Sequence, residues 1–408
     1  MEIKIIRKAC NFFRNVKKDG LKKTLEYFYL GKLQKWDIRV INTFTKHFPL
    51  KNVIIIESHD DFDCNGGAFY DYLLRHEYNK KYKIVWLLKN PAPRKLPRNV
   101  KGYDFIRPNF MKAYYICVAK IFTADNWITP KVRSDQKVYY LTHGGITFKN
   151  VKGFIVIPDY VDYILSASAN YDPYVCKNYS IPYPNNRMLH FGYPSTDCFF
   201  METPNEFRKI SSQGYDKVIL WMPTFRKGGS PGRNDSTIDQ PLGIPLINDL
   251  ETYGRLNEYL KANNSFMIIK IHPGQELDNL KITDMSNIKV VTKYTVKELQ
   301  LDPYRLMKSA DAFISDYSSS SYQYLLLNRP IAFVLADLRE YKLGFCVDNM
   351  EDFLPGEYIY TYEDFIAFLD HSFHGYDTCR EKREKLLEHF YEYQDGNACK
   401  RLVEFMEL

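Results

Sequence analysis

The sequence predicts an α/β protein made of two successive doubly wound domains that face a cleft. Three observations favour this fold class: short β-branched runs alternate with stretches of helical spacing, the alternation stops once near mid-chain, and it then starts again. A chain of 408 residues, 45% of them hydrophobic, is long enough for two or three domains with buried cores. Doubly wound folds bind ligands at the carboxyl ends of their strands, so we expect the functional site in the cleft.

The first set of expected strands follows residue 50. It comprises residues 51–58, 82–88, 120–125, 137–144 and 161–168, which are rich in β-branched and aromatic residues. Between the first two of these runs, residues 66–78 have the spacing of an amphipathic helix. Turn-forming residues dominate 188–206, which we expect to be the junction between the two domains.

The second set of expected strands follows this junction. It comprises residues 217–225, 265–273, 288–292, 311–316 and 330–335. A long polar insertion at 228–243 is expected to be a loop, and residues 380–393 have helical spacing. Two α/β units in succession are therefore expected, each with a parallel sheet covered by helices.

Composition excludes several classes of protein. Eight cysteines are scattered without a CxxC pair, which favours reduced thiols in a cytosol over a disulfide framework or a zinc site. No apolar run approaches the roughly 20 residues of a membrane-spanning helix. Lysines and arginines interrupt the amino terminus, so no secretory signal core is expected.

Residues 1–48 are expected to form a basic amphipathic leader. Residues 1–50 hold twelve Lys and Arg against four Asp and Glu, and helical spacing gathers Leu21, Leu25 and Phe28 beside the cations. Such a helix can lie on an anionic membrane surface, and the alternative is a helix packed on its own domain with solvated charges. No nucleic-acid partner is expected, because the positive charge is confined to one end of the chain.

His143 is the first candidate for chemistry. It follows an expected strand and precedes Gly144 and Gly145, which leave its ring uncrowded and allow a substrate to approach the backbone. A histidine near its ordinary pKa can accept a proton from an attacking hydroxyl. The alternative is a buried, hydrogen-bonded histidine at a tight turn.

Two more strand ends carry candidate residues. Thr224 and Arg226 close the expected strand 217–225, and a guanidinium there can fork onto a phosphate. His272 closes the strand 265–273 immediately before a proline, and would project into the cleft. The alternatives are a surface arginine and a turn histidine.

A run of hydroxyl residues follows the strand 311–316. Asp316 and Tyr317 precede four successive serines, Ser318 to Ser321, which open an expected helix. Free backbone N–H groups, the positive helix terminus and several hydroxyls favour an anion site. The alternative is a helix cap, which needs only one or two serines.

Asp61-x-Asp63 resembles the start of a calcium loop. Its twelfth position is Tyr72, where such a loop needs a bidentate glutamate, so no metal is expected.

Taken together, these segments resemble the CDP-glycerol glycerophosphotransferases, bacterial enzymes of teichoic acid and capsular polymer synthesis. LTHGGITFK (141–149) takes the place of the family's WHGTPLK-like element, MPTFR (222–226) that of APTWR, and KIHP (270–273) that of KLHP. SDYSSSSYQYLLLNRP (315–330) is similar to TDYSSxxFDYLLLDRP, and NGGAFYDYL (65–73) to NPxALYEYL. A DGNA stretch at 395–398 with Arg401 also matches, so the resemblance keeps motif order over roughly residues 50 to 405.

The resemblance implies two Rossmann-like domains with a glycosyltransferase-B-like arrangement. It divides the chain into the leader 1–48, an acceptor-side domain 49–205, a donor-binding domain 206–380 and a C-terminal helix 381–408 that packs back on the first domain. It implies transfer of a polyol phosphate from CDP-glycerol or a related CDP-polyol to a lipid-linked or polymeric glycan acceptor, with release of CMP and without a cofactor. The expected place is the cytoplasmic face of the bacterial cell membrane.

Residue roles follow from the same resemblance. His143 corresponds to the base, and His272 to a donor toward the diphosphate or departing phosphate. The expected substrate-binding residues are Gly144, Thr224, Arg226, Asp316, Ser318, Ser319, Ser320 and Gln323. Such chemistry needs positioning and charge neutralisation more than covalent help.

Departures from the family pattern leave alternatives open. Gln323 and Asn328 stand where the family has aspartates, so ribitol or another alcohol is a candidate beside glycerol. A CMP-sugar-dependent glycosyltransferase, similar to sialyl- or polysialyltransferases, is the second hypothesis. A non-catalytic membrane-associated scaffold is the third.

Overall fold

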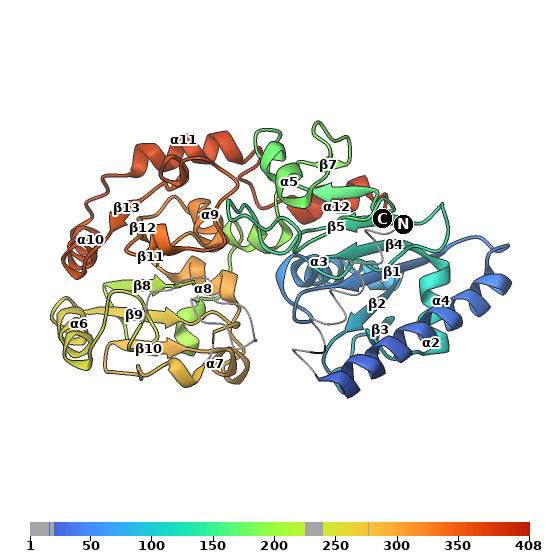
Figure 1. Ribbon diagram of the computed structural model, residues 1–408, viewed down its shortest axis with the longest axis horizontal. Coiled ribbons are helices and arrows are strands. Elements are labelled where there is room, and N and C mark those ends of the chain that lie inside the picture. The colour runs from blue at the N-terminus through green and yellow to red at the C-terminus, as the bar shows by residue number, and fades with distance from the viewer. Residues whose placement is uncertain (1–15, 17–19, 225–239, 276) are drawn as a thin grey trace.

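The computed structural model describes Val16 and residues 20–224, 240–275 and 277–408. Two α/β lobes lie side by side, each built on a parallel sheet (Figure 1). In the described residues the first sheet has seven strands in the order β3-β2-β1-β4-β5-β6-β7. Its strands are β1 (Lys51–Glu57), β2 (Lys83–Leu88), β3 (Val100–Asp104), β4 (Ala119–Ala124), β5 (Lys137–Tyr140), β6 (Tyr163–Leu165) and β7 (Met188–Leu189).

The second sheet has the order β10-β9-β8-β11-β12-β13, six strands in the described part of the chain. They are β8 (Lys217–Trp221), β9 (Ser265–Lys270), β10 (Ile288–Val291), β11 (Ala312–Ser315), β12 (Ile331–Val334) and β13 (Glu357–Ile359). In both sheets the chain first adds strands toward one edge and then continues on the other side of the first strand. The switch lies between β1 and β4 in the first sheet and between β8 and β11 in the second, as in doubly wound sheets.

Helices cover the sheets on both faces. They are α2 (Leu21–Thr45), α3 (Cys64–Arg75), α4 (Phe110–Val118), α5 (Asp172–Tyr179), α6 (Leu250–Ala262), α7 (Lys293–Glu298), α8 (Pro303–Ser309), α9 (Ser319–Leu325), α10 (Tyr362–His374), α11 (Arg380–Phe390) and α12 (Ala398–Phe405). Short 3₁₀ turns are η1 (Tyr78–Lys80), η2 (Pro194–Phe199), η3 (Glu206–Lys209), η4 (Leu277–Asn279), η5 (Leu338–Glu340) and η6 (Met350–Phe353). The α/β class and the two parallel sheets are thus confirmed.

All ten strands expected from the sequence are present, although most end earlier than expected. Three further strands, β3, β7 and β13, were not predicted from the sequence and lie at the outer edges of the sheets. An edge strand is covered less completely, so it needs no continuous apolar run; β3 carries a lysine, a glycine and an aspartate. Because β7 pairs with β6, the expected junction 188–206 begins with a strand of the first sheet.

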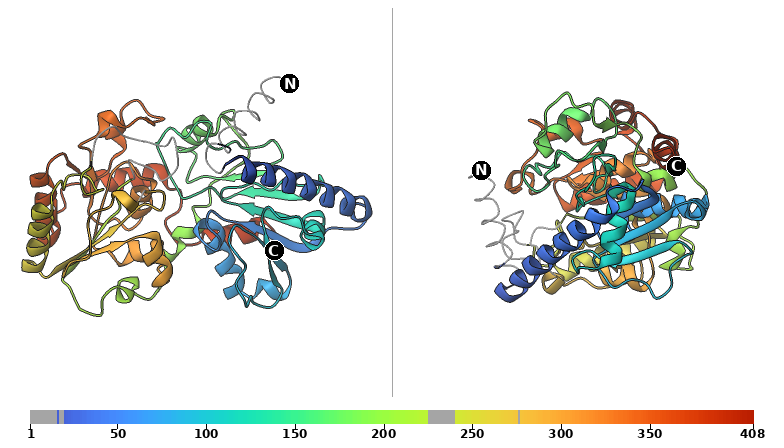
Figure 2. Two further views of the ribbon diagram at one scale, coloured as in Figure 1. Left: turned by 60° about the horizontal axis from the view of Figure 1, so that its bottom comes forward. Right: turned by 90° about the vertical axis from the view of Figure 1, so that its right-hand side faces the viewer.

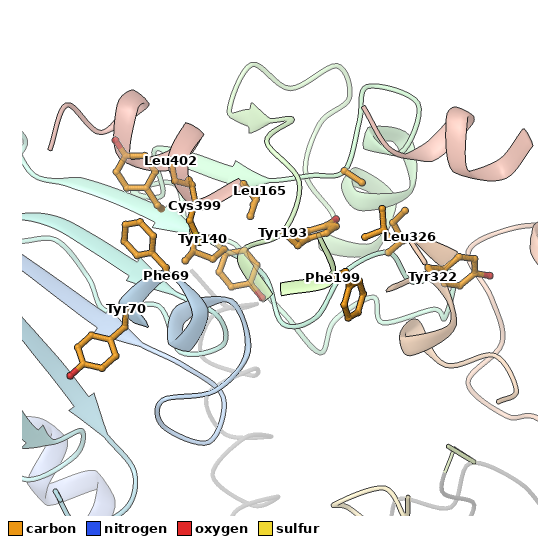
Figure 3. Close-up of a cluster of buried hydrophobic side chains, with 14 of the residues drawn as sticks. Phe69, Tyr70, Tyr140, Leu165, Tyr193, Phe199, Tyr322, Leu326, Cys399 and Leu402 are labelled. Carbon is orange, nitrogen blue, oxygen red and sulfur yellow. The ribbon is translucent and has the colours of Figure 1, made fainter. Parts of the chain in front are cut away.

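The larger hydrophobic core is continuous between the lobes. It joins Ile54 of β1 and Phe148 to Phe313 of β11. Figure 3 shows part of this cluster, in which Phe69, Tyr70, Tyr140, Leu165, Tyr193, Phe199, Tyr322, Leu326, Cys399 and Leu402 are labelled. A second cluster fills the other face of the second sheet, under α6 and α10. This shared core holds the loops at the carboxyl ends of the first sheet against the second lobe.

The carboxyl-terminal stretch forms two helices instead of the single expected one. The segment between α11 and α12 contains Gly396, whose φ is +68° and where an added Cβ would lie 2.7 Å from the Phe200 Cβ. α12 then packs on α3 and η2 beside the first sheet (Figure 1). The end of the chain therefore ties the first lobe to helices that follow the second sheet.

Only part of the expected leader is described, and residues 1–15 and 17–19 lie outside the described residues. From Leu21 the chain forms α2, which packs along α4 on the outside of the first lobe (Figure 2). Among the described residues, no helix has both the length and the apolar character needed to cross a membrane. The seven cysteines of the described part are free thiols.

Asp197 provides a test of the α12 junction. Its buried carboxylate accepts hydrogen bonds from the backbone N–H groups of Ala398 and Cys399, both at 2.9 Å. Asp197→Ala would leave two buried donors unsatisfied, so we expect the free energy of unfolding to fall by about 2 kcal/mol or more. Urea denaturation measures this loss, and the exposed Asp348→Ala is the matched control. Equal stability of the two variants would contradict the assigned role.

Candidate functional site

The loop after β5 is held by one buried side chain, Asn65 at the start of α3. Its amide Nδ2 donates to the carbonyl oxygens of Leu141 (2.9 Å), Thr142 (3.0 Å) and Gly144 (2.9 Å). Its Oδ1 accepts from both the backbone N–H and the hydroxyl of Ser195. The amide is fully used and fully buried, so it fixes the backbone on both sides of residue 143.

His143 projects from this loop into a cluster of polar side chains. Its ring stacks on that of His59, with centroids 4.1 Å apart, and its Nδ1 lies 3.6 Å from the Cys64 Sγ. Cys64 also contacts the Tyr304 hydroxyl at 3.7 Å. Burial raises the pKa of the Cys64 thiol to about 11, so the thiol stays protonated at neutral pH. Burial lowers the pKa of His143, which favours the neutral imidazole that a base requires.

The same cluster reaches the second lobe through α9. Gln323 Nε2 donates to the Tyr304 hydroxyl at 3.3 Å. A Cβ built on Gly144 would lie 3.6 Å from Gln323 Nε2 and 3.7 Å from Ser319 Oγ. The structure therefore brings the loop of His143 and Gly144 together with Ser319 and Gln323 of α9, although the loop and the helix belong to different lobes.

The serine run has a mixed role. Ser318 caps α9: its hydroxyl accepts from the N–H of Ser320 (3.5 Å) and from the Ser320 hydroxyl (2.9 Å). The alternative of a helix cap is thus realised for Ser318. Ser319 faces Gly144, and the buried Ser321 hydroxyl has no hydrogen-bond partner among the residues that the structure describes. The hydroxyls of Ser319 and Ser321 take no part in the cap of α9.

Thr224 and Asp316 meet at the carboxyl ends of β8 and β11. The buried Asp316 carboxylate accepts from the Thr224 N–H at 2.8 Å and from the Thr224 hydroxyl. Lys149, from the first lobe, places its Nζ 3.3 Å from Thr224 Oγ1 and over the rings of Tyr317 and Tyr341. A positive charge of the first lobe thus reaches the second. Arg226 lies outside the described residues.

His272 stands at the same edge of the second sheet. It is exposed after β9, and its Nδ1 accepts from the N–H of Gly274 at 3.0 Å. β8 separates β9 from β11, so the strand ends that carry His272 and Asp316 are about 10 Å apart. Next to His272, Lys270 is buried, and burial lowers its pKa to about 8.

Asp61 and Asp63 are used in the turn before α3. Asp61 accepts from the backbone N–H groups of Lys89 (3.0 Å) and Asn90 (2.8 Å), and Asp63 accepts from that of Asp60 (2.9 Å). In the described part of the chain, no three His, Cys, Asp or Glu side chains are grouped as metal ligands.

Four residues of this region escaped the sequence analysis. Asn65 belongs to the motif NGGAFYDYL and Lys149 to LTHGGITFK, so membership in a motif could have marked both as site residues. His59 and Tyr304 are far from His143 in sequence and carry no motif of their own. Only the fold brings them beside His143.

The electrostatics around His143 predict the direction of a pKa change. Burial lowers the pKa of His143, and the nearby Asp63 carboxylate opposes this by favouring the imidazolium. Asp63→Asn removes that anion, so we expect the His143 pKa to fall further below 6.5. NMR titration of isotope-labelled histidine measures it, with Asp135→Asn at the opposite end of β5 as control. A pKa at or above the ordinary value in the unsubstituted protein would refute this environment.

Comparison with known proteins gives a consistent result. The family described as CDP-Glycerol:Poly(glycerophosphate) glycerophosphotransferase matches residues 41–408. The teichoic acid glycerol-phosphate primase of Bacillus subtilis is 24% identical over 372 residues, 85% of this chain and 90% of that protein. The teichoic acid ribitol-phosphate polymerase TarL of Staphylococcus aureus is 28% identical over 393 residues, 89% of this chain, which spans 64% of that longer protein.

Solved structures of the wall teichoic acid polymerase TagF have the same fold. One superimposes with a TM-score of 0.70 at 18% identity, covering 100% of this chain and 98% of the other. The match of the family over nearly the whole chain leads to one conclusion: this chain belongs to the CDP-glycerol:poly(glycerophosphate) glycerophosphotransferase family and is a phosphotransferase.

Proposed function

We propose that this enzyme transfers a polyol phosphate from a CDP-activated polyol to a hydroxyl of a growing teichoic acid chain, and releases CMP. The observation that carries the proposal is the contact of the His143 loop with α9, where Gly144 meets Ser319 and Gln323. A candidate base from one lobe and candidate phosphate-binding groups from the other thus share one location. Transfer between two bound substrates requires such proximity.

In this reaction His143 acts as the base. The acceptor oxygen attacks the β-phosphorus of the donor, and its proton passes to the neutral imidazole. The bond between the β-phosphorus and the bridging oxygen breaks, and CMP leaves with that oxygen. The product is a phosphodiester. The stacked His59 and the Cys64 thiol hold the ring of His143 in place and limit its solvation.

The second lobe supplies the groups for the donor. Ser319 offers a hydroxyl. The Thr224 hydroxyl donates to Asp316 and the Ser320 hydroxyl donates to Ser318, so these two side chains shape the donor site. Lys149, Lys270 and His272 supply positive charge or N–H donors toward the diphosphate, and Arg226 is the further candidate. Phosphoryl transfer depends on such charge neutralisation and alignment.

The relatives support the choice of substrates. The B. subtilis primase is named for glycerol phosphate and the S. aureus TarL for ribitol phosphate, and one TagF structure was obtained after a soak with CDPG. CDP-glycerol and CDP-ribitol are therefore the proposed donors, and a teichoic acid or capsular polymer the acceptor. The CMP-sugar glycosyltransferase is not favoured, because the matching family and relatives transfer polyol phosphates.

A transfer assay tests this function. The purified chain with CDP-glycerol or CDP-ribitol and a lipid-linked polyol-phosphate primer should release CMP and incorporate phosphorus into the polymer. His143→Ala should lower kcat by about 10²–10⁴-fold, because it removes the base, while Asn65 and not the ring holds the backbone of this loop.

The exposed His374→Ala, in α10, is the control and should keep full activity. No CMP release from either donor, or an active His143→Ala, would rule out the proposed mechanism. A glycosidic product without phosphorus would instead restore the CMP-sugar hypothesis.

We further propose that α2 places the enzyme on the cytoplasmic face of the bacterial membrane, where lipid-linked acceptors reside. Its outward face carries a stripe of exposed apolar side chains at helical spacing: Leu21, Leu25, Phe28, Tyr29 and Trp36. Lys32 lies within the stripe, with its Nζ over the Phe28 ring. Exposed aromatic and cationic groups on one helix face suit an anionic lipid surface.

Vesicle sedimentation tests the membrane proposal. Phe28→Ser with Trp36→Ser should weaken binding to phosphatidylglycerol vesicles several-fold, because both rings are more than half exposed on the stripe. Tyr294→Ser with Tyr376→Ser, which removes equally exposed rings from the second lobe, is the control. Unchanged vesicle binding would favour the alternative of a helix that only packs on its own lobe.

A further inference from the structure

A second basic segment lies outside the leader and outside the candidate site. Residues 78–103 hold eight lysines and arginines and no aspartate or glutamate. The cations are Lys80, Lys81, Lys83, Lys89, Arg94, Lys95, Arg98 and Lys101. This segment contains β2, β3 and the proline-rich loop between them.

Four of these cations line a groove with a volume of about 460 Å³, which we call the basic groove: Lys83, Arg94, Arg98 and Lys101. It lies at the amino ends of β2 and β3, at the edge of the first sheet (Figure 1). Its wall is fixed by local hydrogen bonds. Asn79 donates to the carbonyl of Arg98 and Asn99 donates to that of Asn79, both at 3.0 Å.

The loop that forms the wall is also restricted by its sequence. Prolines at 91, 93 and 97 fix φ at three positions. The loop packs tightly on β3: a Cβ added to Gly102 would lie 3.3 Å from Ala92 and 3.5 Å from Leu96, both in the loop. The cations of the basic groove are thus carried by a backbone that is ordered before any ligand binds, which lowers the entropy cost of binding.

The cations of the basic groove lack acidic partners. Within the described chain, no carboxylate forms an ion pair with Lys83, Arg94, Arg98 or Lys101, whereas the nearby Lys80 pairs with Glu77 and Lys89 with Glu57. Four like charges around one concavity repel one another. A ligand with several negative charges would relieve this repulsion, and arginine guanidinium groups match phosphate geometry.

The basic groove and the candidate site lie at opposite ends of the strands of the first sheet. β2 runs for six residues from the groove toward the candidate site, about 17 Å at 3.3 Å per residue. At its far end Lys89 donates to the carbonyl of His59, whose ring stacks on His143. β2 itself is buried, so a polymer of repeating phosphodiesters would reach both ends by passing outside β3, the edge strand.

The geometry favours such a polymer over a lipid surface. Along β3, Tyr103 faces α4, where its ring lies 6.0 Å from that of Tyr115, and α2 packs on α4. The neighbouring Gly102 points to the opposite face and meets the loop at Ala92 and Leu96. The loop wall of the basic groove therefore lies on the face opposite α2, whereas Lys83 and Lys101 alternate to the face of Tyr103 and line the groove from the end of the sheet. Because the groove wraps around the sheet edge, it suits a chain better than a flat lipid surface.

We propose that the basic groove binds the phosphodiester backbone of the acceptor polymer, away from the reacting end. The proposal rests on the proposed transfer function, since it names the part of the enzyme that retains a long acceptor. Removal of its charges should weaken binding of long acceptors and leave turnover of short ones intact.

The test measures binding and turnover separately. The triple variant Arg94→Gln/Arg98→Gln/Lys101→Gln is compared with Lys261→Gln/Lys385→Gln/Lys400→Gln, which removes three exposed charges elsewhere. Fluorescence anisotropy follows a labelled glycerol-phosphate oligomer without any donor. The groove variant should bind it about tenfold more weakly, about 0.5 kcal/mol per lost contact, and with a smaller dependence on salt. The control should bind like the unsubstituted chain.

Turnover gives the second readout. With a long acceptor the groove variant should show a raised KM, and with a single-unit primer both kcat and KM should be unchanged. Arg98→Glu alone provides the same comparison if the triple variant is unstable. Oligomer binding equal to that of the control would overturn the proposal, as would a loss of binding to phosphatidylglycerol vesicles with oligomer binding intact.

The two proposals can fail independently. If oligomer binding depends on the basic groove but no donor yields CMP, the proposed role of the groove stands and the proposed transfer function is wrong. If CMP is released and the groove variant binds and extends long acceptors normally, the proposed transfer function stands and the proposed role of the basic groove is wrong.

Discussion

The site depends on one buried amide. Asn65 donates to three carbonyls of the loop after β5 and accepts twice from Ser195, so it holds the backbone on both sides of His143. The loop is thereby pressed against the first turn of α9, and the two lobes share a location that neither sheet provides alone. The backbone after this point is also fixed, because the carbonyl of Phe148 accepts from the N–H of Cys346 in the second lobe at 2.8 Å.

The connection between the lobes is apolar as well as polar. Phe148 packs against Tyr322 and Phe353 of the second lobe and against Phe390 of α11, with ring centroids 4.6 to 5.3 Å apart. This cluster belongs to the same continuous core as β1 and β11. The candidate base and the hydroxyls of α9 are therefore held by packing on both sides, which suits a reaction that depends on alignment.

Much of this arrangement could be predicted from the sequence, and the physical reason is clear. Central parallel strands are apolar on both faces, so β1, β9 and β11 were visible as runs, and the residues after them marked the functional edge of each sheet. Edge strands such as β3 could not be predicted, because polar residues interrupt their apolar ones and no apolar run forms. The stacking of His59 on His143 and the contact of Tyr304 with Cys64 depend on how distant segments meet, which no local pattern encodes. The cap formed by Ser318 also shows that one serine of the run serves the helix itself.

The central claim is that residues of both lobes face one bound donor. Hydrogen–deuterium exchange with and without CDP-glycerol tests it most directly. The account predicts slower exchange in two separate peptides, one spanning 141–149 and one spanning 316–325, at the same donor concentration. Protection confined to the peptide of one lobe would contradict it.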